Sequence, residues 1–184
     1  DPVLYFWKYF YQLVYRINIK NTYALIVQQN WMATEMYKRY KPNKIVVARP
    51  TGEINQVLES DSNYYELCDK HNIPQNKILV FYPSYYRYFK NQQALLDASK
   101  LALLEKRLQN HHFILTIDID DLKYNKRKKD EIRNQENISL IGKISREMVE
   151  TFYKKVDIMV FPSKLETWGL PLSEFSRYNK PIIC

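Results

Sequence analysis

The sequence predicts an α/β protein built on a doubly wound parallel sheet, together with the end of a second α/β domain. Strand-like apolar runs alternate with helical patterns along most of the 184 residues. Most of these runs are β-branched or aromatic without polar alternation, as expected of strands that are covered on both faces. The 46% hydrophobic content is ordinary for a chain with a buried core. Six runs have this strand-like character: 23–27, 44–48, 78–82, 113–117, 138–141 and 158–161.

The N-terminal residues 4–17 predict an amphipathic helix. Its apolar side chains recur at three- and four-residue spacing: Trp7, Phe10, Val14 and Ile17. Its polar residues lie on another face: Lys8, Gln12 and Arg16. We expect the helix to pack against the protein, although its aromatic content also suits a membrane interface.

Three more helices lie between the strand-like runs. One is expected at 31–40, closed by Pro42. The next is a long helix with one apolar face, formed by Ala94, Ala98, Leu101, Leu104 and Leu108. Ser145 is a suitable N-cap for the last one. Its inward-pointing residues are Met148, Val149 and Phe152.

The expected domain organisation has three parts. Residues 1–50 form the end of one domain, and 76–184 form a second domain. Residues 51–75 are polar and end near Pro74, which indicates a linker with a short helix or an insertion. The run 181–183 reads as a buried strand that is just beginning, so we expect the chain to be the interior of a longer protein.

Composition excludes several classes of site. The three glycines are too far apart for a dinucleotide-binding turn or a Walker loop. The two cysteines and three histidines lack the spacing of a zinc site, and the thiols suit a reducing compartment. No apolar stretch is long enough to span a bilayer. The net charge of +8 suits an anionic partner, but much of the excess lies at 123–129, which we interpret as a solvated loop.

Ligands of open α/β sheets bind beyond the carboxyl ends of the strands, so the residues that follow each run are informative. Arg87 and Lys90 follow the run 78–82 and precede a helix, where two cations can hold a diphosphate. Residues 142–145 form a tight turn into a capped helix, with backbone groups that can read a base edge.

A cluster of carboxylates, Asp118, Asp120 and Asp121, follows the run 113–117. Such a cluster can coordinate Mg²⁺ or Mn²⁺. We interpret it instead as a solvated strand end, because the cations of 123–129 follow directly and reduce the need for a metal counter-charge.

The last run is followed by a turn with paired acids. Pro171 suits the first position of a helix, and Gly169 permits close approach, so free amides of Gly169, Leu170 and Leu172 can face an anion. Glu166 and Glu174 flank this positive helix end. On spacing alone, the acids are also explained as compensation of the helix dipole.

The block Phe-Pro-Ser-x-x-Glu-Thr-x-Gly-Leu-Pro-Leu-x-Glu at 161–174, followed by Lys-Pro-Ile-Ile at 180–183, resembles the donor-binding block of retaining glycosyltransferase family 4, also called glycosyl transferases group 1. These enzymes have the GT-B fold, whose C-terminal domain is Rossmann-like. The resemblance is strong over 78–184. Upstream, the pattern Ile-Val-Gln-x-x-Trp-Met at 26–32 looks like the end of the family's acceptor-binding domain.

The resemblance implies a role for each matching residue. Glu174 matches the carboxylate that accepts hydrogen bonds from the ribose diol, and Glu166 matches the one that contacts the transferred sugar. Lys90 matches the lysine on the diphosphate. Lys143 and Ile144 match the backbone that frames the base, and the turn at 169–172 matches the amides that face phosphate and sugar. No metal or other cofactor is implied.

Two departures from the family pattern stand out. Ser84 and Tyr85 occupy the positions of a usual glycine and arginine, so Arg87 is the candidate substitute from a shifted position. The acceptor-binding domain is nearly all missing, so we expect this chain to bind donor but to transfer poorly.

The resulting hypothesis is a retaining glycosyltransferase that uses a nucleotide-sugar donor and a saccharide or lipid-linked acceptor in surface polysaccharide or lipopolysaccharide assembly. We expect it in the cytoplasm, with peripheral contact to the anionic inner face of the membrane, and not on nucleic acid. The alternative is a non-catalytic basic module that binds nucleic acid or acidic lipid through 123–129 and exposed tyrosines. A related GT-B phosphorylase or epimerase is a third possibility. The paired glutamates favour the enzyme, because a binder of phosphate polymers has no reason to place them at its anion site.

Overall fold

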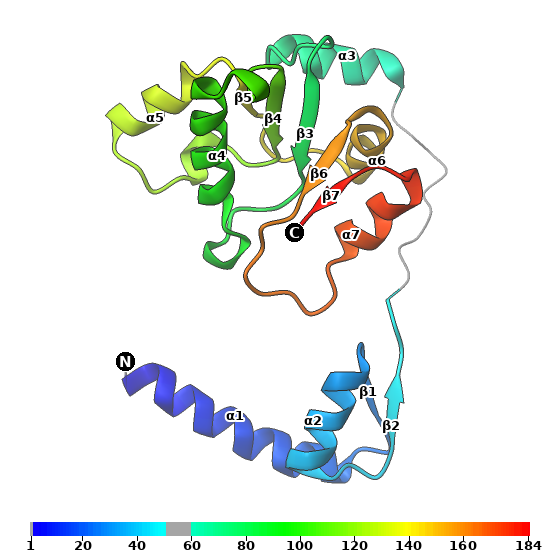
Figure 1. The fold of residues 1–184 in the computed structure, drawn as a ribbon. Helices are drawn as coiled ribbons and strands as arrows, with labels where there is room; N and C mark the ends of the chain where they lie inside the picture. The colour runs from blue at the N-terminus through cyan, green and yellow to red at the C-terminus, as the bar shows by residue number, and fades with distance from the viewer. Residues whose placement is uncertain (1, 51–59) are drawn as a thin grey trace. The chain divides into compact units, whose positions relative to one another are not determined.

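The structure is a computed structural model that describes residues 2–50 and 60–184. The chain divides into one unit up to residue 51 and a second from residue 52 onward (Figure 1). The expected linker or insertion at 51–75 lies partly outside the described residues. Its described part contains α3 (Asp61–Lys70), whose Tyr64 ring packs 5.1 Å from the Phe152 ring of the second unit. This helix is therefore part of the second unit's core.

The first unit has the helix–strand–helix–strand order that the sequence predicts. It contains α1 (Pro2–Asn21), β1 (Leu25–Val27), α2 (Asn30–Tyr40) and β2 (Ile45–Val47). The two strands are parallel, with Leu25 opposite Ile45 and Val27 opposite Val47.

The packing of α1 differs from the expectation. The helix contacts α2 through Tyr15, whose ring lies 6.1 Å from that of Tyr40, and Ile19 is buried. Trp7, Phe10 and Ile17, on the predicted inward face, are all exposed within the described part of this unit. No helix among the described residues is long and apolar enough to cross a membrane.

The second unit contains a parallel sheet, which confirms the predicted fold class. Its strands are β3 (Ile78–Tyr82), β4 (His111–Leu115), β5 (Ile138–Leu140), β6 (Ile158–Val160) and β7 (Ile182–Ile183). Their order is β5-β4-β3-β6-β7, and all neighbouring pairs are parallel. The remaining helices are α4 (Gln92–Leu104), α5 (Lys126–Arg133), α6 (Arg146–Lys155) and α7 (Leu170–Phe175).

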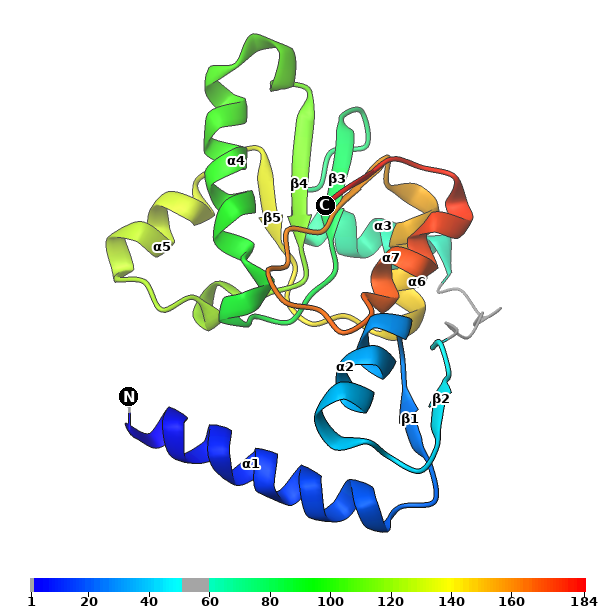
Figure 2. The ribbon, with the colours of Figure 1, turned by 60° about the horizontal axis from the view of Figure 1, so that its bottom comes forward.

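The helices cover the two faces of the sheet. Right-handed crossovers place α4 and α5 on one face and α6 and α7 on the other. Figures 1 and 2 show this division, with α3 on the side of α6 and α7. The core contains the fully buried Phe81 of β3, stacked 5.0 Å from Phe152 of α6. Ser145 caps α6 as predicted, because its Oγ accepts from the Met148 amide at 3.0 Å.

Two element predictions were wrong in detail. β4 begins two residues before the expected run 113–117, because His112 is a buried strand residue whose Nε2 lies 2.8 Å from the Ser139 hydroxyl on β5. The apolar face assigned to α4 is largely exposed at Leu101 and Leu104. The helix buries a neighbouring face instead, formed by Gln92, Leu95, Leu96, Ser99 and Ala102.

Two further expectations need correction. Residues 126–129 of the basic run belong to α5 and are not a loop, since Asn125 caps this helix by accepting from the Lys128 amide. The final run is a strand, but Ile183 is exposed because β7 is the edge of the sheet among the described residues.

Candidate functional site

The sheet has a topological switch point between β3 and β6. The two strands are neighbours, but their following helices, α4 and α7, cover opposite faces, so a crevice opens beyond their carboxyl ends. Hydrogen bonds join the two loops that border it. Asn91 Nδ2 donates to the Pro162 carbonyl at 3.2 Å, and the Lys164 amide donates to the Phe89 carbonyl at 2.7 Å. These hydrogen bonds fix the positions of the two loops that border the crevice.

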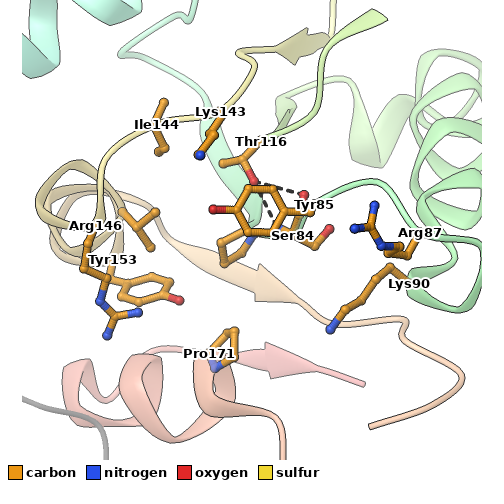
Figure 3. A pocket seen from close by; sticks show the side chains of 12 residues that line it. Ser84, Tyr85, Arg87, Lys90, Thr116, Lys143, Ile144, Arg146, Tyr153 and Pro171 are labelled. Carbon is orange, nitrogen blue, oxygen red and sulfur yellow. Dashed lines mark hydrogen bonds between the residues drawn. The ribbon is translucent and has the colours of Figure 1, made fainter. Parts of the chain in front are cut away.

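A cavity of about 360 Å³ lies at this edge of the sheet. Its walls come from loops after β3, β4 and β5 and from α6 and α7 (Figure 3): Pro83, Ser84, Tyr85, Arg87, Lys90, Thr116, Lys143, Ile144, Arg146, Val149, Tyr153 and Pro171. Four of these residues are cations, and none is an acid. The cavity is therefore suited to an anionic ligand.

The loop after β3 is held rigidly. The Ser84 amide donates to Thr116 Oγ1 at 2.8 Å, and that hydroxyl donates to the Ser84 carbonyl at 3.2 Å. The buried Gln92 side chain donates to the Tyr85 carbonyl at 2.8 Å. These bonds present the exposed Tyr85 ring to the cavity, with Lys143 Nζ 5.7 Å from its centroid. Ser84 and Tyr85, the departures from the family pattern, thus have a defined local structure.

Lys90 and Glu166 form an ion pair across the switch point. Lys90 Nζ contacts Glu166 Oε1, and the two side chains are 21% and 27% exposed. Lys90 Nζ also lies 5.5 Å from the centre of the Phe161 ring. Burial raises the pKa of Tyr82 to about 12, so its hydroxyl stays protonated and donates to the Lys90 carbonyl at 2.7 Å. The structure therefore fixes a cation and a carboxylate side by side in the crevice.

Glu174 is almost completely buried, at 2% exposure, and has a bidentate partner. Arg146 Nη2 lies 2.7 Å from Oε1, and Nη1 donates to Oε2 at 3.0 Å. The Tyr153 hydroxyl donates to the same Oε2 at 3.3 Å. Burial raises the pKa of Tyr153, and the hydrogen bond to Glu174 raises the pKa of Arg146. Arg146 is therefore cationic, and Tyr153 remains a donor.

The turn between β5 and α6 brings Lys143 and Ile144 to the cavity. Gly142 has a φ of 70°, in the left-handed region, and its amide donates to the Ile117 carbonyl at 3.0 Å. Arg87 enters from the opposite loop, with Nη1 donating to the Tyr86 carbonyl at 2.9 Å. Among the described residues, neither Arg87 nor Lys143 has an acidic partner within ion-pair distance, so both charges are available to a ligand.

The turn into α7 differs from its expected form. Gly169 is the N-cap, with a φ of 78°, and Leu170 rather than Pro171 begins the helix. The Leu172 amide donates to the Gly169 carbonyl at 2.9 Å, so it is not free as expected. The cavity brings together Arg87, Lys90, Lys143 and Ile144 from the predicted set. The other predicted residues do not line it directly: Glu166, Gly169, Leu170, Leu172 and Glu174.

The acidic cluster has structural partners. Asp118 caps a short 3₁₀ turn, and its Oδ1 accepts from the Asp120 amide at 3.1 Å. Asp120 pairs with Lys129 at 3.0 Å, which lowers the pKa of the carboxyl. Over residues 2–50 and 60–184, no group of three or more His, Cys, Asp or Glu side chains is arranged to hold a metal ion.

Sequence reasoning did not assign eight of the twelve lining residues to the site, among them Thr116, Arg146 and Tyr153. Arg146 directly follows the predicted cap Ser145, so its place at the start of α6 was readable from the sequence. Its pairing with Glu174 was not, because the two residues are 28 positions apart and belong to different helices.

Comparisons with known proteins find a matching family model and similar folds. The family model described as "Glycosyl transferases group 1" matches residues 65–184. No curated protein matches the chain. Among solved structures, a glycosyltransferase from Rickettsia africae ESF-5 is similar, with 19% identity and a TM-score of 0.70 over 94% of this chain and 46% of that one.

Two other solved structures contain ligands. HepE from Anabaena, in complex with UDP and glucose, has 18% identity and a TM-score of 0.67, over 93% of this chain and 47% of that one. The pneumococcal O-GlcNAc transferase GtfA, in complex with UDP and GlcNAc, has 20% identity and a TM-score of 0.64, over 91% of this chain and 31% of that one. The chain thus spans less than half the length of these similar structures, and the likeness identifies the GT-B type of fold.

Proposed function

Because the chain belongs to the family of glycosyl transferases group 1, we propose that it is the donor-binding part of a retaining glycosyltransferase that uses a nucleotide sugar. One observation carries this proposal: the cavity at the switch point is lined by four cations, and the Lys90–Glu166 pair lies in the same crevice. A site for a phosphate polymer needs the cations but not the carboxylate. Transfer of a sugar from a diphosphate needs both.

Different residues bind different parts of the nucleotide-sugar donor. Lys90 and Arg87 bind the diphosphate, since both reach the cavity from the loop after β3. Lys143 and Ile144 frame the base at the turn after β5, and Glu174 accepts from the ribose. Glu166 contacts the transferred sugar, and the turn at 169–172 faces sugar and phosphate, with the Gly169 and Leu170 amides as its donors. The contact between Lys90 and Glu166 supports this division, because sugar and diphosphate are adjacent in the donor.

The main electrostatic requirement of the reaction is to stabilise the negative charge that develops on the diphosphate. An acceptor hydroxyl oxygen bonds to the anomeric carbon, and the bond from that carbon to the diphosphate oxygen breaks with its electron pair going to the phosphate. The hydroxyl proton passes to an oxygen of the departing diphosphate. The departing diphosphate gains negative charge, which Lys90 and Arg87 stabilise without reorganisation because the loop that carries them is already fixed. These cations supply the counter-charge that a divalent metal provides in other enzymes, so we propose donor binding without a metal.

The same proposal includes the acceptor and the cellular setting of the whole protein. The acceptor is a saccharide or a lipid-linked saccharide, and the setting is surface polysaccharide or lipopolysaccharide assembly on the cytoplasmic face of the membrane. The net charge of +8 supports contact with anionic lipid. The rival reading, a nucleic-acid module built on the basic run, is weakened because Lys129 pairs with Asp120 and Arg127 with Glu131.

A thermal-shift screen of nucleoside diphosphates tests the proposal. UDP is the first probe, because the HepE and GtfA complexes contain it, followed by GDP and ADP. A ligand at a hundredfold excess over its Kd stabilises the folded chain by about 2.7 kcal/mol, which is a shift of several degrees. Lys90→Met should reduce the shift. The absence of a shift with every diphosphate and every nucleotide sugar would remove the proposed function.

A further inference from the structure

We propose that Arg146 is a nucleotide-binding residue that recognises the ribose diol jointly with Glu174. The inference rests on the proposed function, in which Glu174 accepts from the ribose. It adds a residue outside the motif block that carries the family resemblance, and it follows from where the guanidinium lies.

Arg146 lies in the cavity wall, and Glu174 lies behind Arg146. Arg146 lines the cavity and its side chain is 41% exposed, whereas Glu174 does not line the cavity and is 2% exposed. Figure 3 shows the Arg146 guanidinium beside the Tyr153 ring, on the side toward α7. Because Arg146 contacts both carboxylate oxygens of Glu174, a ribose that approaches Glu174 from the cavity also approaches Arg146.

The hydrogen-bonding capacity of the pair fits a diol. A carboxylate offers about four lone-pair positions, and Glu174 uses one on each oxygen for Arg146 and one more on Oε2 for Tyr153. One position remains on Oε1. A guanidinium has five N–H donors, of which two are used in the bidentate contact with Glu174. A hydroxyl both donates and accepts, so the pair presents an acceptor and donors side by side to the two ribose hydroxyls.

Arg146 also orients Glu174. Its guanidinium contacts both carboxylate oxygens, at 2.7 Å from Oε1 and 3.0 Å from Oε2. This bidentate contact fixes the orientation of the carboxylate before any ligand arrives.

A neighbouring ion pair provides a matched control. Arg177 Nη2 lies 3.1 Å from Glu150 Oε1, with side-chain exposures of 30% and 4%. This pair also joins α6 to the chain next to α7, since Arg177 lies in the 3₁₀ turn Ser176–Tyr178 that follows α7. Neither of its residues lines the cavity. It represents an arginine–glutamate bridge with a purely structural role.

The test is calorimetric titration of the chain with UDP, GDP and ADP and with their 2′-deoxy counterparts. For the nucleotide that binds wild type most tightly, Arg146→Ala should weaken the ribonucleotide at least tenfold and the deoxyribonucleotide at most threefold, so the preference for ribose is lost. Arg146→Lys, which keeps the charge but not the bidentate geometry, should recover part of the preference. Arg177→Ala should lower the melting temperature and leave the preference unchanged. In a Glu174→Ala background, Arg146→Ala should have no further effect on the preference.

The outcomes separate this inference from the proposed function. If no diphosphate binds wild type, the proposed function fails, and with it the basis of the inference. If wild type binds but Arg146→Ala weakens both sugar forms equally, Arg146 supplies only charge and the inference is wrong. Tighter binding by Arg146→Ala would also overturn it, because Arg146 would then block Glu174. Melting curves identify a variant that fails to fold, and Arg146→Gln then replaces Arg146→Ala with the same expected loss of preference.

Discussion

Substitution of Glu166 by glutamine should strengthen the binding of a nucleoside diphosphate that carries no sugar. In the free chain, Lys90 Nζ is engaged by Glu166, so the lysine must be shared with the incoming diphosphate. Glutamine has the same shape and no charge. The change therefore frees Lys90 and also removes a negative charge next to an anionic ligand.

The exposures of the two side chains set the size of the effect. At 21% and 27% exposure the pair is only partly screened by water, and pairs of this kind contribute up to about 1 kcal/mol. Glu166→Gln should accordingly lower the Kd for UDP, GDP or ADP by about two- to fivefold. In the full-length enzyme the same variant should turn over more slowly, because the contact with the transferred sugar acts mainly in the transition state.

Calorimetry on a double-mutant cycle measures this coupling. Lys90→Met should weaken the diphosphate by about 1.5 to 3 kcal/mol, the range of a charge-assisted hydrogen bond. In that background, Glu166→Gln should give little further gain, because no lysine remains to be freed. Equal or weaker binding by Glu166→Gln alone, or the same gain with and without Lys90, would refute the reasoning.

Two further predictions concern pH and metal. Burial lowers the pKa of His112 from 6.5 to about 4, so stability should be complete above pH 6.5 and fall by about 3 kcal/mol as the pH decreases to 4, at 1.36 kcal/mol per pH unit. Urea unfolding at pH 7 and pH 4.5 measures the loss of stability. His112→Gln should reduce the difference in unfolding free energy between the two pH values. An unchanged difference would show that another group titrates. EDTA should leave the affinity for the diphosphate unchanged, because cations of the chain already offset its charge. A tenfold loss that Mn²⁺ restores and Asp120→Asn abolishes would instead assign a metal role to the acidic cluster.

Local patterns predicted the elements well where burial and apolar character coincide. β3 has the expected bounds because Ile78–Tyr82 is a continuous apolar run in the middle of the sheet. β4 was displaced by two residues because a buried histidine reads as polar, and only the contact with Ser139 explains its place. The face of α4 was misassigned because the exposed Leu101 and Leu104 have the same hydrophobicity as buried leucines.

The candidate site was predictable in outline but not in its pairings. Arg87, Lys90 and Lys143 follow strands that end at one edge of the sheet, so topology alone brings them together. The Lys90–Glu166 contact joins residues 76 positions apart. The partner of Glu174 lies on another helix. Such contacts depend on how the helices pack over the sheet. The periodicity of a single segment carries no information about that packing.

The central claim is that the cavity beyond β3 and β6 binds the diphosphate of a nucleotide sugar. The most direct measurement is calorimetric titration of the chain with UDP, GDP and ADP, and in parallel with duplex DNA, at two salt concentrations. We predict that one diphosphate binds with a stoichiometry of one, that Lys90→Met weakens it, and that DNA does not bind. No heat with any diphosphate, together with tight and salt-sensitive binding of DNA, would contradict the claim in favour of the nucleic-acid module.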